Sequence, residues 1–204
     1  MDNNMDQKIY VVGSEIKNDI VEEFSRVFRG LHRNFWYALR ISVLIVISFF
    51  ECEKCGRCCM YSPPVFRRDE AERIAGFLGK SVDELPLTMF VQFFDVYYRA
   101  PKPCPFLDKE NKKCRVYEVR GASCRSFPHE WLMYAMIPTY CPAVFKAIKK
   151  ATKFIKENKE KIQVAIEIME NDLKRLAGDS KFKDRMRYME YGPLVKKLMQ
   201  VLNS

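Results

Sequence analysis

The sequence predicts an α+β fold dominated by helices, in which a small irregular cysteine-cluster core carries N- and C-terminal helical extensions. Apolar residues recur at helical spacing near both ends of the chain, and all eight cysteines lie between residues 52 and 141. Residues 85–127 contain four prolines and three cysteines and show no sustained period, which is typical of irregular structure. We therefore expect an N-terminal helix and apolar segment at 1–49, a cysteine-cluster metal-binding domain at 50–145, and a basic helical extension at 146–204 packed on it.

The first predicted element is a helix over residues 14–40. Ser14 can cap its N-terminus, because a serine oxygen accepts hydrogen bonds from the first free backbone amides of a helix. The apolar residues that follow recur at spacings of three and four: Ile16, Ile20, Phe24, Val27 and Leu31.

The apolar run at residues 41–50 is rich in β-branched residues and predicts a buried strand or core segment. Ten residues are too few for a membrane-spanning helix, which needs about 20. The arginines before the run would also place the following cysteines outside the cell under the positive-inside rule. We therefore expect no membrane insertion, and we expect the run to be buried against residues 85–98.

Short helices follow the first cysteines, and longer ones end the chain. Asp69–Leu78 reads as a helix, and Ser81 with Glu84 has the form of a capping box. A helix is expected after Cys141–Pro142, and a second one after Lys161 that ends near Gly178.

The composition points to metal binding before any motif is considered. The chain has eight cysteines but two histidines, and its first residues, MDNNMDQK, do not resemble a secretory signal. Disulfides are rare in a reducing cytosol, so the cysteines of a cytoplasmic protein are better explained as metal ligands. We expect a cytoplasmic location.

The net charge of +9 is concentrated at the C-terminal end, where residues 143–204 hold 15 Lys and Arg against 8 Asp and Glu. A solvated helix face is the ordinary explanation of such a run, and an acidic redox or substrate protein is a possible partner. Exposed aromatic residues are not interleaved with the lysines, so nucleic acid is a less favoured partner. The lysines of this stripe are Lys146, Lys149, Lys150, Lys153 and Lys156.

The segment ECEKCGRCC has the spacing C-x2-C-x2-C-C, which recurs in zinc and iron–sulfur sites because two intervening residues let a tight turn bring two sulfurs to one metal. Eight thiolates suit two four-ligand sites, or one cubane cluster with spare or zinc-bound cysteines. Neighbouring side chains of an extended segment point to opposite faces, so we expect Cys58 and Cys59 to serve different sites, or one of them to be spare. The candidate ligands are Cys52, Cys55, Cys58, Cys59, Cys104, Cys114, Cys124 and Cys141.

Other polar residues lie beside the last cysteine motif. Arg120 and Arg125 flank Cys124, and with Tyr117 they are candidates to neutralise an anionic cluster or hold an anionic ligand; pairing with Asp or Glu is the alternative. His129 is a structural histidine rather than a ligand in our interpretation. The chain lacks the glycine-rich nucleotide-binding motifs and H-E-x-x-H, so we assign no catalytic residue and leave open whether it is an enzyme.

The cysteine motif, followed by CPFL at 104–107 and CRVYEVRGASCRSFP at 114–128, resembles the zinc- or iron-chelating CxxCxxCC (YkgJ-type) cysteine-cluster family. The resemblance implies metal ligation by seven of the cysteines, with Cys141 a common addition, and flagellin lysine-N-methylases are similar over the cluster. The family usually has proline where this chain has Gly121.

We therefore expect a metal-binding protein that holds an iron–sulfur cluster of the [4Fe–4S] type. Its role would be electron transfer, or to serve as the cluster module of a protein-modifying, methylase-like system. The alternative is a structural zinc-binding interaction protein without catalytic activity.

Overall fold

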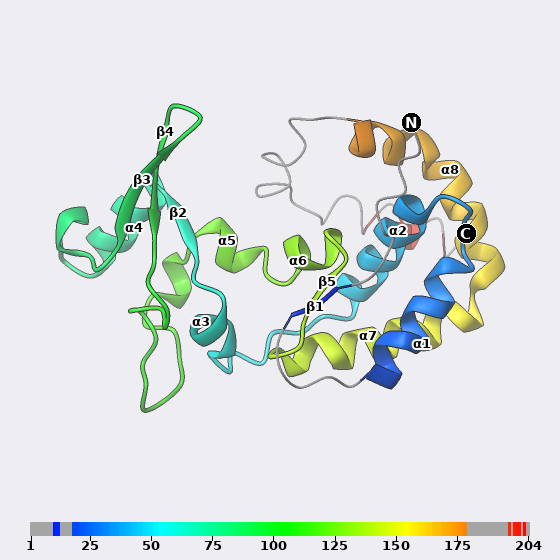
Figure 1. The fold of residues 1–204 in the computed structure, drawn as a ribbon, viewed down its shortest axis with the longest axis horizontal. Coiled ribbons are helices and arrows are strands. Elements are labelled where there is room, and N and C mark those ends of the chain that lie inside the picture. The colour runs from blue at the N-terminus through cyan, green and yellow to red at the C-terminus, as the bar shows by residue number, and fades with distance from the viewer. Residues whose placement is uncertain (1–9, 13–17, 179–195, 197, 201, 203–204) are drawn as a thin grey trace. The chain divides into compact units, whose positions relative to one another are not determined.

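The computed structural model describes residues 10–12, 18–178, 196, 198–200 and 202. Helices predominate, and the described strands form a three-stranded antiparallel sheet and a two-stranded parallel sheet (Figure 1). The predicted α+β class with a helical majority is therefore confirmed.

The chain divides into two compact units. The helical unit combines Met1–Glu51 with Pro128–Ser204, and the cysteine unit is Cys52–Phe127. The two segments predicted as terminal extensions are thus parts of one unit, and the cysteine unit is inserted between them.

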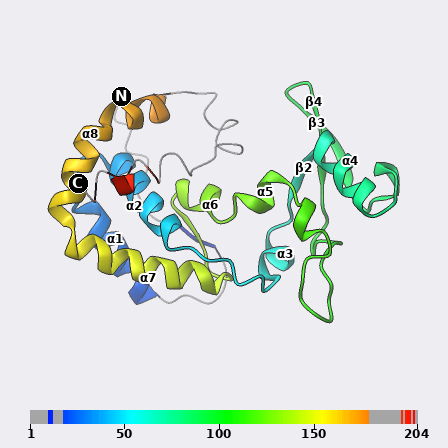
Figure 2. The same cartoon turned by 180° about the vertical axis from the view of Figure 1, so that it is seen from behind.

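The helical unit is built mainly from helices that pack on one another, as the reverse view in Figure 2 also shows for α1, α2, α7 and α8. Strands β1 (Tyr10–Val12) and β5 (Met136–Pro138) pair in parallel. The helices are α1 (Asn18–Arg29), α2 (Phe35–Ser48), α6 (His129–Met133), α7 (Pro142–Glu157) and α8 (Lys159–Gly178).

The helix predicted over residues 14–40 is two helices, so this prediction was wrong in its extent. α1 ends at Arg29, and Asn34 caps α2 because its Oδ1 accepts hydrogen bonds from the backbone amides of Trp36 at 3.0 Å and Tyr37 at 3.3 Å. The predicted start, residues 14–17, lies outside the described residues. The cap at Asn34 turns the chain, so that α2 packs back on α1.

Residues 41–48 of the apolar run at 41–50 are part of α2 and not a strand. Residues 41–46 are all buried, which confirms that the run belongs to a core. Its partners are α1, α6, α7 and α8, so the expected cover by residues 85–98 was also wrong. A helix that is apolar on every side fits a position surrounded by other helices.

Among the helices that the structure describes, none combines the length and the apolarity that a bilayer crossing requires.

The basic stripe lies on one side of α7. All five of its lysines are exposed, and the opposite side is buried at Val144, Ala147, Ala151 and Ile155. Pro142 occupies the first turn of this helix, where its missing amide hydrogen is not needed. α8 is described as far as Gly178, and the residues after the predicted helix end lie outside the described part of the chain.

The cysteine unit has a sheet at one end and short helical turns between its cysteines. Strands β2, β4 and β3 pair antiparallel in that order. The hairpin of β3 and β4 corrects the expectation that residues 85–127 have no regular structure, whereas the chain after it has only an isolated bridge and two short helical turns. The elements are α3 (Arg57–Tyr61), β2 (Val65–Arg67), α4 (Arg68–Phe77), η1 (Val82–Glu84), β3 (Thr88–Gln92), β4 (Asp95–Arg99), η2 (Tyr117–Val119) and α5 (Ala122–Arg125).

The two predicted helix starts in this unit are confirmed. α4 covers nearly the residues expected, and Glu84 Oε2 accepts hydrogen bonds from the Ser81 amide at 2.7 Å and the Ser81 hydroxyl at 2.8 Å. Phe66 and Ile74 lie in the apolar core of the unit, against which Cys59 and Cys124 pack. The thiols therefore sit beside a packed core.

Candidate metal centre

Four short segments, two of them helical, bring cysteine side chains together in the cysteine unit. Cys58 and Cys59 lie on α3, and the backbone amide of Cys104 donates to the carbonyl of Cys59 at 2.8 Å. Cys114 is fixed by a β-bridge to Leu107, and Cys124 lies on α5. The segments that carry these cysteines are up to 66 residues apart in the sequence, from Cys58 to Cys124.

Cys59 is the centre of this group of thiols. Its thiol shares hydrogen bonds with the thiols of Cys58, Cys104 and Cys114. Cys124 is close enough for the charges of Cys104, Cys58 and Cys114 to act on it. We call these five residues the thiol cluster.

The arrangement of the two adjacent cysteines differs from the prediction. The segment is helical and not extended, so the side chains of Cys58 and Cys59 lie close enough to hydrogen-bond to each other. Both can therefore face one site, which corrects the expectation that they point to opposite sides.

The thiols of the cluster differ in pKa: two have raised values and three have lowered values. Hydrogen bonds with Cys104, Cys114 and Cys58, together with burial, raise the pKa of Cys59, which keeps its proton. The hydrogen bond with Cys59 lowers the pKa of Cys58 to about 7 and that of Cys114 to about 6, and it also lowers the pKa of Cys104. Burial raises the pKa of Cys124 to about 12. The cluster thus stabilises the thiolates of Cys58, Cys104 and Cys114, while Cys59 and Cys124 keep their protons.

The chemistry of these donors fits a thiophilic metal. Thiolates are the ligands of zinc and of iron–sulfur clusters, and a metal takes the place of the thiol protons. In the described part of the chain, no three or more His, Cys, Asp or Glu side chains are already arranged as a set of metal ligands. Binding would therefore require the thiols to turn from one another toward the metal.

The other three predicted cysteine ligands are not among these contacts. Cys52 is exposed, and its Sγ accepts a hydrogen bond from the backbone amide of Lys54 at 3.4 Å; Cys55 is half-buried. Cys141 is buried at the N-cap of α7 in the helical unit. His129 begins α6 in that unit, and burial lowers its pKa to about 4, so it is neutral at pH 7.

Arg120 is the predicted basic residue that lies beside the thiols. Its positive charge favours the thiolates of Cys58 and Cys114, in the same direction as the larger effect of the hydrogen bond with Cys59. Its guanidinium carbon lies 4.0 Å from the centre of the Tyr117 ring, and a cation–π contact of this kind holds the side chain in place. Arg125 donates to the carbonyl of Arg120 and so supports it through the backbone.

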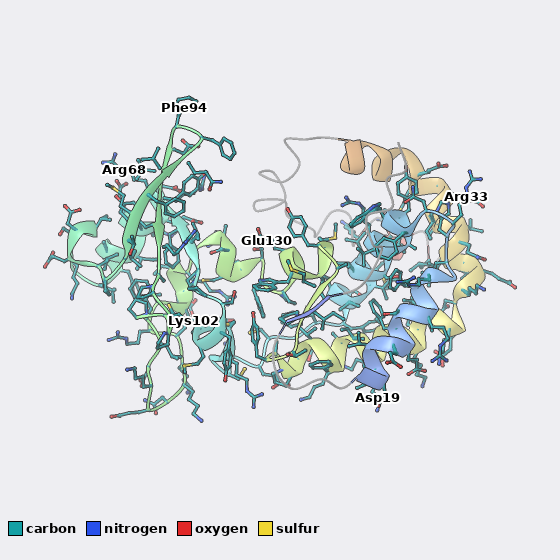
Figure 3. All side chains as sticks on the ribbon, viewed as in Figure 1. Asp19, Arg33, Arg68, Phe94, Lys102 and Glu130 are labelled. Atoms are coloured by element: carbon teal, nitrogen blue, oxygen red, sulfur yellow. The ribbon has the colours of Figure 1, made fainter. Side chains whose placement is uncertain are left out.

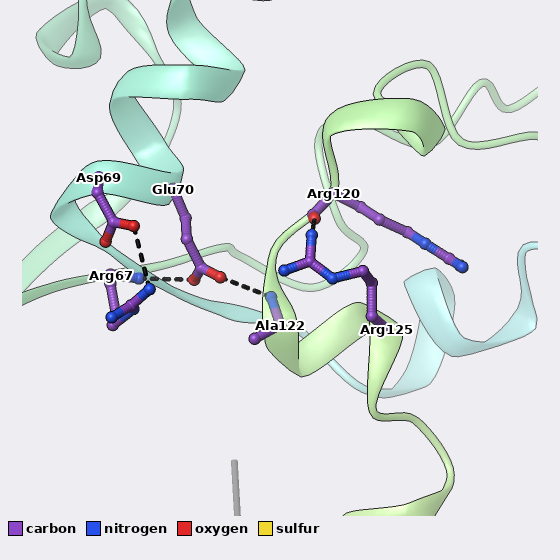
Figure 4. Close-up of polar contacts among 6 residues, drawn as sticks. All are labelled: Arg67, Asp69, Glu70, Arg120, Ala122 and Arg125. Carbon is purple, nitrogen blue, oxygen red and sulfur yellow. Dashed lines mark hydrogen bonds and ion pairs between the residues drawn. The ribbon is translucent and has the colours of Figure 1, made fainter. Parts of the chain in front are cut away.

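A buried carboxylate that sequence reasoning missed connects α4 to α5. Glu70 is 2% exposed, and its two oxygens accept from the backbone amide of Arg67 at 3.0 Å and from that of Ala122 at 2.7 Å (Figure 4). Ala122 begins the helix that carries Cys124, so Glu70 positions that cysteine. Glu70 lies in the first turn of α4, where acidic residues are favoured, but nothing in the sequence indicates the bond to a residue 52 positions away.

The glycine at residue 121, where the family that the motifs resemble usually has proline, has a local explanation. The φ of Gly121 is −70°, which is close to the angle that proline prefers. A Cβ atom there would lie 2.6 Å from Cδ1 of Phe66. The backbone therefore has a proline-like turn, and the Phe66 ring takes the space that the proline ring would need.

Gly56 is required where the chain enters α3. Its φ is +68°, and a Cβ atom would lie 2.4 Å from the carbonyl oxygen of Lys112, two residues before Cys114. We expect Gly56→Ala to lower the free energy of unfolding of the cysteine unit by about 3 kcal/mol, since a left-handed alanine alone costs about 1–2 kcal/mol and the overlap adds to it.

Gly79→Ala is the matched control, because Gly79 has a φ of +66° and no heavy atom within 4 Å of the added Cβ. This substitution should lower the free energy of unfolding only by the cost of a left-handed alanine, about 1 kcal/mol. Urea unfolding of both variants measures the difference, and equal losses would contradict the close approach of Gly56 to Lys112.

Comparison with known proteins agrees with the resemblance seen in the motifs. Residues 51–142 match the model of the CxxCxxCC family, described as "Putative zinc- or iron-chelating domain". An uncharacterized protein of Methanocaldococcus jannaschii is 43% identical over 84 residues, which are 39% of this chain and 44% of that protein. The chain thus spans less than half the length of this curated relative. No solved structure matches.

Proposed function

We propose that residues 51–142, the part of the chain that matches the CxxCxxCC family, bind a metal through cysteine thiolates. The observation that carries the proposal is the contact of the Cys59 thiol with the thiols of Cys58, Cys104 and Cys114. Cys124 completes the ligand set nearest to this centre, and Cys52, Cys55 and Cys141 remain proposed ligands.

The metal that we propose is an iron–sulfur cluster of the [4Fe–4S] type. The spacing of Cys52, Cys55 and Cys58 is that of the first three ligands of bacterial ferredoxins. Arg120 places a positive charge beside Cys58 and Cys114, and a cluster bound by four thiolates is anionic and benefits from such a neighbour. Such a cluster would supply one-electron chemistry, in electron transfer or within a methylase-like, protein-modifying system.

Zinc is the second candidate, and a specific observation favours it. The Cys59 thiol is already in hydrogen-bond contact with three others. One tetrahedral ion at about 2.3 Å from each sulfur holds its thiolates roughly 4 Å apart, which suits thiols that are already neighbours. Zinc would make the cysteine unit a structural module for protein interaction.

Purification without oxygen, followed by metal and sulfide analysis and a visible spectrum, tests both candidates. Iron and acid-labile sulfide in equal amounts with visible absorption would support the cluster. Zinc in a colourless protein would support the structural site. Protein that takes up neither metal after reconstitution would contradict the proposal. A thiolate site also requires free cysteines, so the proposal includes a reducing compartment such as the cytoplasm.

The basic stripe on α7 is the proposed contact for an acidic redox or substrate protein. Lys149, Lys150 and Lys153 are exposed, and the ion pair of Lys153 with Glu157 is 3.8 Å long and also exposed. Exposed charges are screened over about 10 Å at 0.1 M salt, so association through the stripe should weaken steeply as salt is added.

We expect replacement of Lys149, Lys150 and Lys153 by Glu to remove this salt-dependent binding and to leave the metal content unchanged. An acidic ferredoxin is the probe, and its binding is titrated at low and high salt. The same charge change at Lys80, Lys159 and Lys161, which are also exposed, is the control and should leave more of the binding intact. Loss of metal from the stripe variant would show that these lysines support the fold.

A further inference from the structure

We propose that the chain forms a dimer in which β3 of one copy pairs antiparallel with β3 of a second copy. The strand order β2-β4-β3 places β3 at an edge of the sheet, and among the described residues no other strand pairs with its free side. The unpaired amides and carbonyls of an edge strand are a template for another strand.

β3 has none of the features that ordinarily prevent such pairing. Its sequence is TMFVQ, without charge or proline, whereas the opposite edge, β2, has three residues and includes Arg67. Met89 is 61% exposed and Val91 is 67% exposed, although both are apolar. Natural edges are blunted by charge, proline or short length, so an uncharged, apolar edge indicates an interface.

The register of the hairpin identifies which backbone groups are available. Gln92 pairs with Asp95 across a two-residue turn, and pairs alternate from there between hydrogen-bonded and non-hydrogen-bonded. Val91 and Met89 fall in the non-hydrogen-bonded pairs with β4, so their amides and carbonyls point away from β4 to the free edge. Phe90 exchanges its hydrogen bonds with Tyr97 instead.

The outward-pointing amides and carbonyls of β3 can form hydrogen bonds with the same groups of β3 in a second copy. With Phe90 opposite Phe90 of the second copy, Met89 lies opposite Val91, and two outward-pointing residues meet in each such pair. Each pair can exchange two backbone hydrogen bonds. The strand is uncharged, so no like charges meet, and the stacked pair of Phe90 and Tyr97 extends across the interface.

The proposed dimer would also give an apolar neighbour to one of the two exposed phenylalanines at the tip of the hairpin. Phe93 is 73% exposed and Phe94 is fully exposed, and both have positive φ, of 52° and 69° (Figure 3 labels Phe94 at the tip). A positive φ is uncommon for bulky residues and is stored strain that the surroundings must support. The proposed register brings the half-buried Leu87 of the second copy level with Phe93, which gives this exposed ring an apolar neighbour.

Sedimentation of the full, metal-loaded chain over a wide concentration range tests the dimer. We expect the mass to rise from 24.1 kDa to twice that value. Amide exchange at low and high concentration should show new protection at Met89 and Val91 and little change at Phe90. A chain that stays monomeric at the highest concentration would overturn the proposal.

Charge exchange tests the register. Met89→Lys combined with Val91→Lys places lysines opposite each other and should weaken self-association at least about tenfold. Met89→Glu combined with Val91→Lys places opposite charges in both pairs and should restore it. A dimer that persists in the first variant, or a second variant that stays monomeric, would overturn the proposal. Circular dichroism and metal content verify that each variant is folded, so failure here is separate from failure of the metal site.

Discussion

Replacing Cys59 with serine should release the metal and destabilise the cysteine unit. Cys59 contacts three of the other cluster thiols, so its loss removes all three of these contacts at once. Metal binding contributes about 10–16 kcal/mol of folding free energy in small structural zinc domains, so one lost ligand costs on the order of 3 kcal/mol. Metal analysis and thermal unfolding of the purified variant measure the two effects.

A variant with a packing defect in the same core separates metal loss from general instability. Ile74 is fully buried in the core that Cys59 packs against. Ile74→Val should cost about 0.5–1.5 kcal/mol and retain the metal. A Cys59→Ser protein with full metal content and unchanged stability would show that Cys59 is not a ligand.

Replacing Ile45 with lysine should unfold the helical unit. Ile45 is 1% exposed in α2, and its neighbours on the helix, residues 41–46, are all buried. An unpaired ammonium there loses its hydration without gaining a partner, at a cost of several kcal/mol, which is comparable to the whole stability of an ordinary domain. We expect loss of helical circular dichroism, or aggregation on expression.

Ile168→Lys is the matched control, because it makes the same substitution on α8 at a side chain that is 56% exposed. It should change stability by no more than about 0.5 kcal/mol. If Ile45→Lys were as stable as this control, the burial of α2 described above would be wrong.

The predictions that succeeded depended on local signals. Pro142 marked the start of α7 because proline suits the first turn of a helix. The alternation of lysines and apolar residues correctly predicted the two sides of that helix.

The error at α2 came from the absence of a periodic pattern. Val43, Ile45 and Val46 favour strands when taken singly, and a segment buried on all sides has no polar face to reveal its period. The cap at Asn34 was the local signal for the start of this helix. It was missed because apolar spacing continued across it.

The hairpin was missed for a different reason. A two-residue turn with positive φ at both positions is usually marked by Asn-Gly, and here the turn residues are Phe93 and Phe94. The pairing of β4 with β3 and with β2, and not turn propensity, fixes the position of this hairpin. No single-sequence rule assigns it.

Within the candidate site, sequence identified the thiols but not their arrangement. The helical conformation of α3 makes neighbours of Cys58 and Cys59, and the buried Glu70 links α4 to α5 across a long separation. Both depend on contacts between distant segments, which spacing along the chain does not encode.

The insertion of the cysteine unit within the helical unit determines the order in which the protein can fold during synthesis. The ribosome releases α2 (Phe35–Ser48) roughly ninety residues before α7 (Pro142–Glu157) is available to cover it, a delay of about 5–20 s at ordinary elongation rates. The cysteine unit, by contrast, is complete once Phe127 has left the ribosome. Binding of the proposed metal by the thiol cluster can therefore precede closure of the helical unit, while the apolar surface of α2 stays uncovered until α7 follows.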